Sequence, residues 1–305
     1  MPLQARVGLL TGILVFVSSA GILLLYRTEA QRAALLFQDQ AHKVETNFDS
    51  LVTLKGESLR SMSVDYTYWD DMVAFVRHGR AEWARTNIEV ALPTYNVATV
   101  WVYRPDRTLV YHTNTIGLTG LREIPVPKLA FTRLFARGPF SHFFISTTKG
   151  FIEIRGATIH PTQDEKRTQP PRGYLFVGRL WDKAALSELA WLTDSAIDIR
   201  SVGDTPSTAG RVTTRHAITF RRPLRSWAGR PLAFVGVRND ARIVRTLERA
   251  GMRTVMLAVA SAAASLLLFW IFLSAWISRP VRLLSASLSR EDTSHLARLQ
   301  PFDIR

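Results

Sequence analysis

Two long stretches without charged residues constrain this chain more than any other feature of its sequence. Residues 7–26 read VGLLTGILVFVSSAGILLLY, and residues 254–277 read TVMLAVASAAASLLLFWIFLSAWI. A helix rises about 1.5 Å per residue, so each stretch is long enough to cross a hydrocarbon core of about 30 Å. We therefore predict two transmembrane helices at these positions.

The first stretch has an alternative interpretation, because a cleaved signal peptide could end at the small residues VSSA before Gly21. We favour an uncleaved anchor because the apolar run continues through GILLLY. Two spans place both termini on one side of the membrane. We expect residues 1–6 in the cytoplasm, residues 27–253 as a periplasmic domain, and residues 278–305 back in the cytoplasm, in a multi-pass protein of the inner membrane. Flanking charges do not test this topology, because loops this long are translocated largely regardless of charge.

The composition excludes some functions. The chain has no cysteine, which excludes thiolate metal sites and cysteine nucleophiles. Its formal charge is +14, with 33 arginines among 39 basic residues, but no basic motif interleaved with aromatics indicates nucleic acid. Eleven arginines lie from Arg211 to Arg253 against two acidic residues. We favour a solvated face for them, with contact to membrane lipid headgroups as the alternative.

Helical periodicity continues after the first apolar stretch, with apolar residues recurring at intervals of four and three. The first seam is Phe37, Ala41, Val44, Phe48 and Leu51. The second seam is Leu59, Met62, Tyr66, Trp69, Val73 and Val76. The first seam could pair with a second copy of the chain, so we expect a homodimer. The second predicts a helix laid on a globular core and ended by Gly79.

From about Asn96 the apolar period changes to two, which is typical of strands. Three hairpins are predicted, with turns near residues 104–106, 148–150 and 228–229. Short helices are predicted over 126–136 and 181–193, and further strands over 174–180 and 195–202. The polar segment PTQDEKRTQPPRG, residues 161–173, is predicted to be a mobile loop.

Residues 65–76, DYTYWDDMVAFV, combine three aspartates with four aromatic residues. Catalysis is disfavoured because no histidine, serine nucleophile or glycine-rich loop accompanies the carboxylates in a recognisable arrangement. A metal site is disfavoured because it needs several convergent ligands, and His78 lies seven residues beyond Asp71. We therefore predict no catalytic residue, no metal site and no cofactor.

Two interpretations of this motif remain open. In the structural interpretation, which we favour, Trp69 belongs to the core and Asp65 and Asp70 find partners within the fold. A buried carboxylate needs such a partner, and Arg155 and Arg179 on predicted strands are the candidates.

In the second interpretation, the motif contacts a ligand. Tyr66, Trp69, Asp70 and Asp71 would then line a pocket for a small molecule. An aromatic face next to a carboxylate suits a ligand that carries an amine.

The same residues resemble a known family. The motif DYTYWDDMVAFV, following a membrane-anchored helix, is similar to the CHASE sensor domains of the fourth subtype. YLFVGRLWDKAALSELAWLTDSAIDI and GRPLAFVGV are similar to later parts of that family, and the resemblance extends over about residues 48–237. It implies an extracytoplasmic sensor of a bacterial signalling receptor, with an α/β (α+β), PAS/Cache-like fold, a long N-terminal helix and two flanking transmembrane helices.

The segment ISRPVRLLSASL after the second apolar stretch resembles the start of a HAMP linker, with Pro280 just beyond the bilayer. This resemblance implies a cytoplasmic output domain or partner. In the family that output is commonly a diguanylate cyclase, a cyclic-di-GMP phosphodiesterase or a histidine kinase, and none of their motifs occurs in the chain.

The sequence therefore predicts the sensory portion of a membrane receptor, and not an enzyme. It would detect an unknown small molecule or protein outside the membrane. Two alternatives remain, a membrane-anchored enzyme with an external active site and a stand-alone adaptor that acts on a partner protein.

Overall fold

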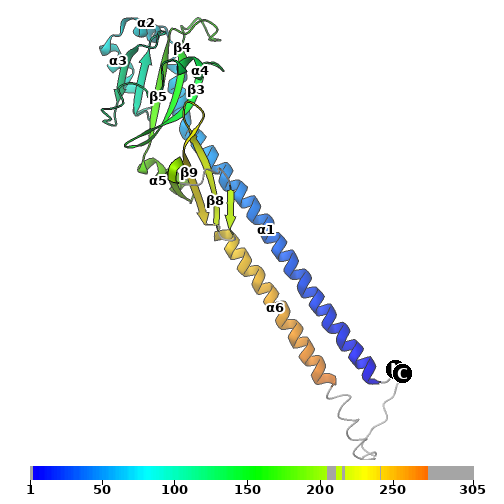
Figure 1. Ribbon diagram of the computed structural model, residues 1–305. Helices are drawn as coiled ribbons and strands as arrows, with labels where there is room; N and C mark the ends of the chain where they lie inside the picture. Colours follow the sequence, from blue (N-terminus) through cyan, green and yellow to red (C-terminus); the bar gives the residue numbers. More distant parts are fainter. Residues whose placement is uncertain (1–2, 205–210, 215–216, 241, 274–305) are drawn as a thin grey trace, which may run out of the picture. The chain divides into compact units, whose positions relative to one another are not determined.

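A computed structural model describes residues 3–204, 211–214, 217–240 and 242–273 (Figure 1). The chain divides into two compact units, one formed by residues 1–38 with 242–305 and the other by residues 39–241. Helix α1, Leu3–Asp65, contributes to both. Pro280 and the other residues of the expected HAMP segment lie outside the described part of the chain.

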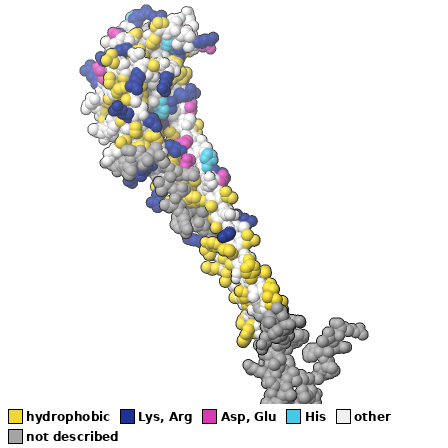
Figure 2. All heavy atoms as spheres, turned by 45° about the vertical axis from the view of Figure 1, so that its right-hand side comes forward, with side chains coloured by type: hydrophobic (Ala, Val, Ile, Leu, Met, Phe, Trp, Pro, Cys, Tyr) yellow, Lys and Arg dark blue, Asp and Glu magenta, His cyan; other side chains and the backbone are white. Residues whose placement is uncertain are grey.

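The first unit contains the start of α1 and helix α6, Arg242–Leu273. Each helix includes a stretch that is long and apolar enough to cross a membrane, within Leu9–Asp65 and Arg249–Phe272. The apolar side chains of these stretches are on the surface, as Figure 2 shows by the yellow atoms along the paired helices. Surfaces this apolar are stable in lipid but not in water. Residues 7–26 and 254–273 of the predicted spans are helical, and 274–277 lie outside the described residues.

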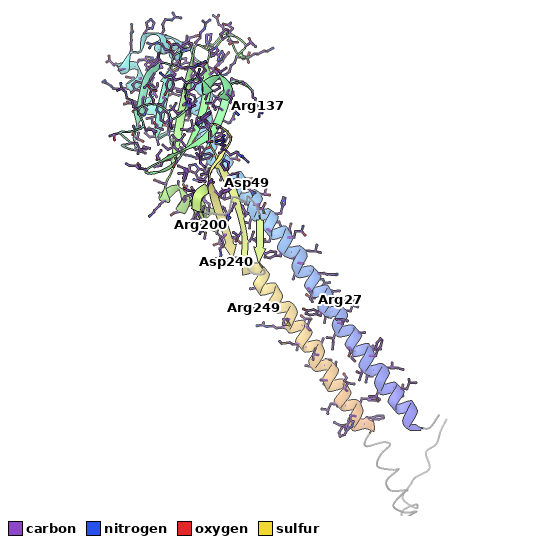
Figure 3. All side chains as sticks on the ribbon, in the orientation of Figure 1. Arg27, Asp49, Arg137, Arg200, Asp240 and Arg249 are labelled. Atoms are coloured by element: carbon purple, nitrogen blue, oxygen red, sulfur yellow. The ribbon has the colours of Figure 1, made fainter. Side chains whose placement is uncertain are left out.

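Charged residues stand at one end of each apolar stretch. Figure 3 labels Arg27 on α1 and Arg249 on α6. Glu29 pairs with Arg32 at 3.3 Å, and a side chain built on Gly251 of α6 would lie 3.2 Å from the Glu29 carboxylate. Gly251 of α6 therefore lies close to the Glu29 side chain of α1 at the level where the apolar surface ends.

The second unit is built around a five-stranded antiparallel sheet in the order β2-β1-β5-β4-β3. The strands are β1 Thr99–Tyr103, β2 Leu109–Asn114, β3 Phe140–Thr147, β4 Gly150–Ile159 and β5 Gly173–Trp181. Two of the predicted hairpins, β1–β2 and β3–β4, form as expected. The mixed helix and sheet architecture with a long N-terminal helix confirms the predicted α/β (α+β) class.

Each face of this sheet is covered. On one face the end of α1 packs with α2 (Asp70–His78), α3 (Ala81–Asn87) and the 3-10 turn η1 (Glu89–Ala91), around Met62 and Phe75. On the other face α4 (Ala130–Leu134) and its flanking loops cover Trp101 and Phe176. Alternate residues of the central strands therefore face two separate apolar cores.

A second sheet follows, in the order β6-β9-β8-β7. Helix α5, Lys183–Leu192, leads into β6, Ala196–Ser201, and the short turn η2, Val202–Asp204. The remaining strands are β7 Arg211–Thr214, β8 Ala217–Arg225 and β9 Pro231–Asp240. The sequence had predicted β6 and the β8–β9 hairpin but not β7.

The first heptad seam of α1 packs inside the chain. Ala41, Val44 and Phe48 are buried, and the Phe48 ring meets Phe220 of β8 edge-on at 5.6 Å. Arg222, also on β8, pairs at 2.9 Å with Asp49, which Figure 3 labels on α1. These seam residues pack against the four-stranded sheet and are not free to pair with a second copy of the chain. The heptad seam was our reason for expecting a dimer, and that reason was wrong.

The second seam does not form one helix. Helix α1 ends at Asp65, and the chain turns before α2 begins at Asp70. Thr67 donates a hydrogen bond to the Ser63 carbonyl at 2.5 Å, and Tyr68 forms a parallel bridge with His160. Aromatic and β-branched residues have low helix propensity, and the bridge stabilises the extended conformation here. Asp65 and Trp69 therefore do not share a helix face.

Candidate functional site

The aromatic residues of the 65–71 motif pack on one another. The Trp69 ring lies 5.9 Å from the Tyr66 ring and 5.2 Å from the Trp83 ring of α3. The Tyr66 ring also meets Tyr95 at 6.1 Å, and its hydroxyl donates to the Asn87 carbonyl at 2.9 Å. The Trp69 and Tyr66 rings thus face other rings, packed against the α2 side of the apolar core.

The three aspartates of the motif point to different partners. Asp65 accepts a hydrogen bond from the Tyr95 hydroxyl at 3.3 Å. Asp70 Oδ1 accepts one from the backbone N–H of Thr162 at 3.1 Å. Asp71 is exposed in the first turn of α2, where the helix dipole stabilises a negative charge. The structure therefore does not bring the three carboxylates together.

Arg167 ties the loop between β4 and β5 to the turn that follows α1. Its guanidinium donates to the Thr158 carbonyl at 2.6 Å, to Thr67 Oγ1 at 3.0 Å and to the Val64 carbonyl at 3.3 Å. The Tyr68 hydroxyl also donates to the Thr162 carbonyl. The loop at 161–173 is thus anchored at several points, and the prediction of a mobile segment is wrong.

Three residues beside this loop have the geometry of a catalytic relay. His160 Nδ1 lies 2.7 Å from Asp164 Oδ2, and His160 Nε2 lies 3.0 Å from Thr158 Oγ1. Burial lowers the pKa of His160, so the imidazole is neutral at pH 7 but is a weaker base than a free histidine. Thr158 is only 5% exposed, so a substrate could not reach its hydroxyl without a rearrangement. In this conformation the relay holds the loop in place.

Arg155 and Arg179 pair with a glutamate of the sheet instead of the motif. Arg179 donates to Glu153 Oε2 at 2.6 Å, and the Arg155 guanidinium lies 3.7 Å from Glu153 Oε1. Trp181 Nε1 donates to the same carboxylate at 3.0 Å, and His142 Nε2 lies 3.1 Å from it. Both arginines were singled out from the sequence but Glu153 was not, although an acidic residue inside the apolar strand FIEI was a signal for such a pair.

Glu153 is a buried carboxylate, and its neighbours offset the free-energy cost of removing its charge from water. Its side chain is 2% exposed. Burial alone would raise its pKa, but the hydrogen bond from His142 and the charge of Arg179 outweigh burial and lower the pKa to about 2. The carboxylate therefore stays ionised at neutral pH.

Helix α1 reaches this network at Lys55 and Gly56. Arg179 donates to the Lys55 carbonyl, and a side chain built on Gly56 would point at Glu153 and Arg155, at 3.5 and 3.6 Å. A glycine inside a helix costs about 1 kcal/mol relative to alanine. At this position a methyl group would only reach ordinary van der Waals contact with the polar residues of the sheet.

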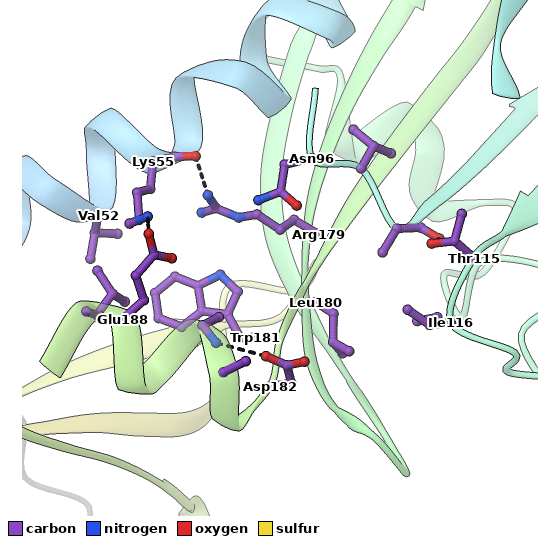
Figure 4. A pocket seen from close by; sticks show the side chains of 15 residues that line it. Val52, Lys55, Asn96, Thr115, Ile116, Arg179, Leu180, Trp181, Asp182 and Glu188 are labelled. Atoms are coloured by element: carbon purple, nitrogen blue, oxygen red, sulfur yellow. Dashed lines mark hydrogen bonds and ion pairs between the residues drawn. The ribbon is translucent and has the colours of Figure 1, made fainter. Parts of the chain in front are cut away.

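A cavity of about 390 Å³ opens next to this junction (Figure 4). Its walls come from α1, from the segments before β1 and after β2, from the end of β5 and from α5. The polar and charged side chains that line it include Lys55, Asn96, Thr115, Arg179, Asp182 and Glu188. Val52 and Leu189 belong to its apolar wall. None of the four predicted ligand residues of the 65–71 motif lines this cavity.

One ion pair crosses the cavity from helix to helix. Lys55 of α1 and Glu188 of α5 lie 2.5 Å apart, as the dashed line in Figure 4 marks. The two residues are 133 positions apart in the chain, so no local sequence pattern could have predicted the pair. The cavity thus combines apolar walls with a few polar groups, which is the usual composition of a small-molecule site.

Residues 52–200 match the family model of the CHASE4 domain. This segment is similar to the CHASE4 domain over just under half of the chain. It contains the aromatic motif, the Glu153 network, the cavity and α5. The CHASE4 match ends inside β6, so strands β7 to β9 of the second sheet lie beyond it.

The chain is also similar to solved structures of sensor domains. It shares 10% identity with the periplasmic domain of Vibrio cholerae LuxQ, covering 66% of this chain and 99% of that one, with a TM-score of 0.41. It shares 9% identity with the sensory domain of the Campylobacter jejuni chemoreceptor Tlp3 (CcmL), covering 72% and 98%, with a TM-score of 0.41. No curated protein matches the sequence.

Proposed function

We propose that the chain is the sensory portion of a bacterial membrane receptor, with its CHASE4 domain on the periplasmic side of the inner membrane. The observation that carries this proposal is the position of the CHASE4 match, at residues 52–200, between two helices that are apolar enough to span a bilayer. A domain placed in this way can transmit an external signal across the membrane only through those two helices.

The signal would be a shift between two conformations of the sensor domain. A ligand that binds one conformation better moves the equilibrium toward it, and each 1.4 kcal/mol of differential affinity changes the ratio tenfold. The shift would pass along α1 and α6 to the segment around Pro280, which would act as a HAMP-type linker. Beyond it we propose a cyclic-di-GMP enzyme or a histidine kinase as output, in a dimeric receptor.

The topology can be tested with reporter fusions in a bacterial inner membrane. Alkaline phosphatase, which is active only after export, is inserted in the exposed turn at residues 228–229 or joined after Arg305. We expect activity at the first site and none at the second. Activity only after Arg305, or a mature chain that begins at Gly21, would contradict the proposed arrangement.

Transmission can be tested by joining the chain after Arg305 to a cyclase or kinase output of measurable activity. One alanine inserted after Gln31, on an exposed part of α1, turns the helix by about 100°. We expect the insertion to lock or reverse the output. An insertion of seven residues, which restores the heptad phase, is the control. Equal output from all three proteins would argue against transmission through α1.

A further inference from the structure

The charged groups that line the cavity differ in how firmly they are held. Arg179 is bound to Glu153 at 2.6 Å and to the Lys55 carbonyl, inside the fold. Asp182 caps α5 by accepting from the Ala185 N–H at 2.9 Å. Lys55 and Glu188 bind each other, with side-chain exposures of 28% and 57%. Ion pairs as exposed as this one contribute little to stability, so this pair is the one that a ligand could open at low cost.

The chemistry of the pair restricts what can replace it. An anion bound to Lys55 alone would displace Glu188 and place two negative charges side by side. A cation bound to Glu188 alone would leave Lys55 without a counter-charge. A molecule with both charges satisfies both residues at once, because its anionic group can accept from the Lys55 ammonium while its cationic group donates to the Glu188 carboxylate.

The rest of the cavity fits a small molecule of this kind. Its volume of about 390 Å³ is near the lower end of the range for ligand sites, about 300–1,000 Å³. Val52 and Leu189 offer apolar contact to the body of the molecule. Asn96, whose backbone has a left-handed φ of 53°, presents an exposed amide that both donates and accepts.

We propose that this cavity binds a small zwitterion that inserts into the Lys55–Glu188 ion pair. The inference rests on the proposed sensory function and names the chemical class of the signal. Insertion removes the direct tie between α5 and α1, one position away from the glycine at which α1 meets the Glu153 network. Binding would therefore change how α1 is held to the sheet, which is the difference between two conformations that a sensor needs.

The experiment uses the full chain in detergent micelles, with thermal unfolding and calorimetric titration as readouts. The probes are the common L-amino acids, ω-amino acids of two to six carbons, and glycine betaine. Acetate and ethylamine are singly charged controls. We expect at least one zwitterion to raise the melting temperature and to titrate with a stoichiometry of one, and we expect acetate and ethylamine to do neither at the same concentration.

Variants of the pair locate the binding. We expect Lys55→Ala and Glu188→Ala each to weaken binding of that zwitterion by about tenfold to a hundredfold, the usual effect of losing one hydrogen bond to a charged group. The reversed double variant, Lys55→Glu with Glu188→Lys, keeps an ion pair and should also weaken binding, because the cavity walls fix which end of the molecule meets each helix. The control is the reversal of Glu57 and Arg60, an exposed pair on α1 at 2.8 Å, which should bind as the wild type does.

Three results would overturn the inference. These are failure of every zwitterion to bind the wild type, equal binding of acetate or ethylamine, and wild-type affinity in the reversed Lys55–Glu188 variant. The proposed function fails separately, since a misplaced reporter or an output insensitive to the α1 insertion leaves this binding measurement unaffected.

Discussion

The five-stranded and four-stranded sheets both pack against α1, but they differ in how deeply they are buried. Every residue of β1 in the five-stranded sheet is buried, and apolar cores lie on both faces of the sheet. In the four-stranded sheet, β6 has no buried residue, and β8 and β9 turn Phe220 and Val237 inward while Arg221 and Arg238 of the same strands face more toward solvent. The first sheet therefore has an interior that holds a buried charge, whereas the edge strand β6 of the second sheet is exposed.

The contacts that α1 makes with the two sheets differ in chemistry. Phe48 and Asp49 bind the four-stranded sheet through an aromatic contact and an exposed ion pair. Lys55 and Gly56 meet the five-stranded sheet through a buried charge network. Polar contacts depend strongly on charge and geometry, while apolar contacts tolerate small shifts. We therefore expect recognition at the first sheet and passive support from the second, and five measurements test this contrast.

Loss of the buried carboxylate should have the largest effect. Glu153→Ala leaves Arg179 buried without its partner, which typically costs about 3–5 kcal/mol. Urea unfolding in detergent, followed by tryptophan fluorescence, measures the change. Glu153→Gln keeps the shape and some hydrogen bonds and should cost less. Equal stability of the alanine variant and the wild type would show that the network does not hold the sheet to α1.

Phe220→Ala should destabilise the second sheet. Removing a buried phenylalanine typically costs about 3 kcal/mol or more, and this ring is the one that meets Phe48. Hydrogen exchange should rise in β8 and β9 and stay unchanged in β4 and β5. Faster exchange throughout residues 39–241 would mean that the two sheets unfold as one cooperative unit, which would break the contrast.

Acid should weaken the first sheet. The folded pKa of Glu153 is about 2, below the ordinary value of about 4.5, so its contribution is complete above pH 4.5 and is lost as the pH falls toward 2. The full shift corresponds to roughly 3 kcal/mol. The stability of the wild type should therefore approach that of Glu153→Gln between pH 5 and pH 3. If the difference in unfolding free energy between the wild type and Glu153→Gln stayed constant over this range, a lowered pKa of Glu153 would be contradicted.

Arg167→Ala should release the β4–β5 loop. The variant leaves the buried Thr158 carbonyl without its guanidinium donor, and an unsatisfied buried group costs about 1–3 kcal/mol. Limited proteolysis should then cut within residues 161–173. Arg172→Ala, in the same loop, is the control. An uncut loop in the Arg167 variant would mean that its other contacts, from Tyr68 and Asp70 to Thr162 and from His160 to Asp164, are enough to hold it.

Lys55→Ala should have the smallest effect on stability in the absence of ligand. Its ion pair with Glu188 is partly exposed, and such pairs contribute about 0–1 kcal/mol. The same urea titration applies, with Arg60→Ala as the control on the neighbouring turn of α1. A loss above about 2 kcal/mol would assign Lys55 to the structural network and remove the reason for which we consider the pair easy to open.

Much of the fold followed from local patterns in the sequence. Two apolar stretches gave the helices of the first unit, period-two alternation gave three hairpins, and Gly79 ends α2 in the left-handed conformation with its N–H on the Phe75 carbonyl. These features depend on residues that are near one another in the chain. The break at residues 66–69 was missed because the bridge from Tyr68 to His160 joins segments about ninety residues apart.

The interior of the candidate site was harder to predict for the same reason. Arg155 and Arg179 were predicted as partners of the motif aspartates, and their actual partner Glu153 became clear only with the register of β4 against β5. The loop at 161–173 looked unstructured because it is polar and rich in proline, and its anchors Arg167 and Asp164 act through side-chain contacts that composition does not reveal. The cavity depends on elements from four parts of the chain.

The four-stranded sheet ends in a feature that matters for the chain before it is fully folded. Strand β7 pairs with β8 only as far as Phe220, so of the described strands only β9 lies beside Pro223. Proline offers no N–H to an incoming strand, and natural sheets use it to blunt open edges against aggregation. A polypeptide that is still unfolded can meet identical neighbours, and Pro223 reduces the chance that two of them pair as strands along this border.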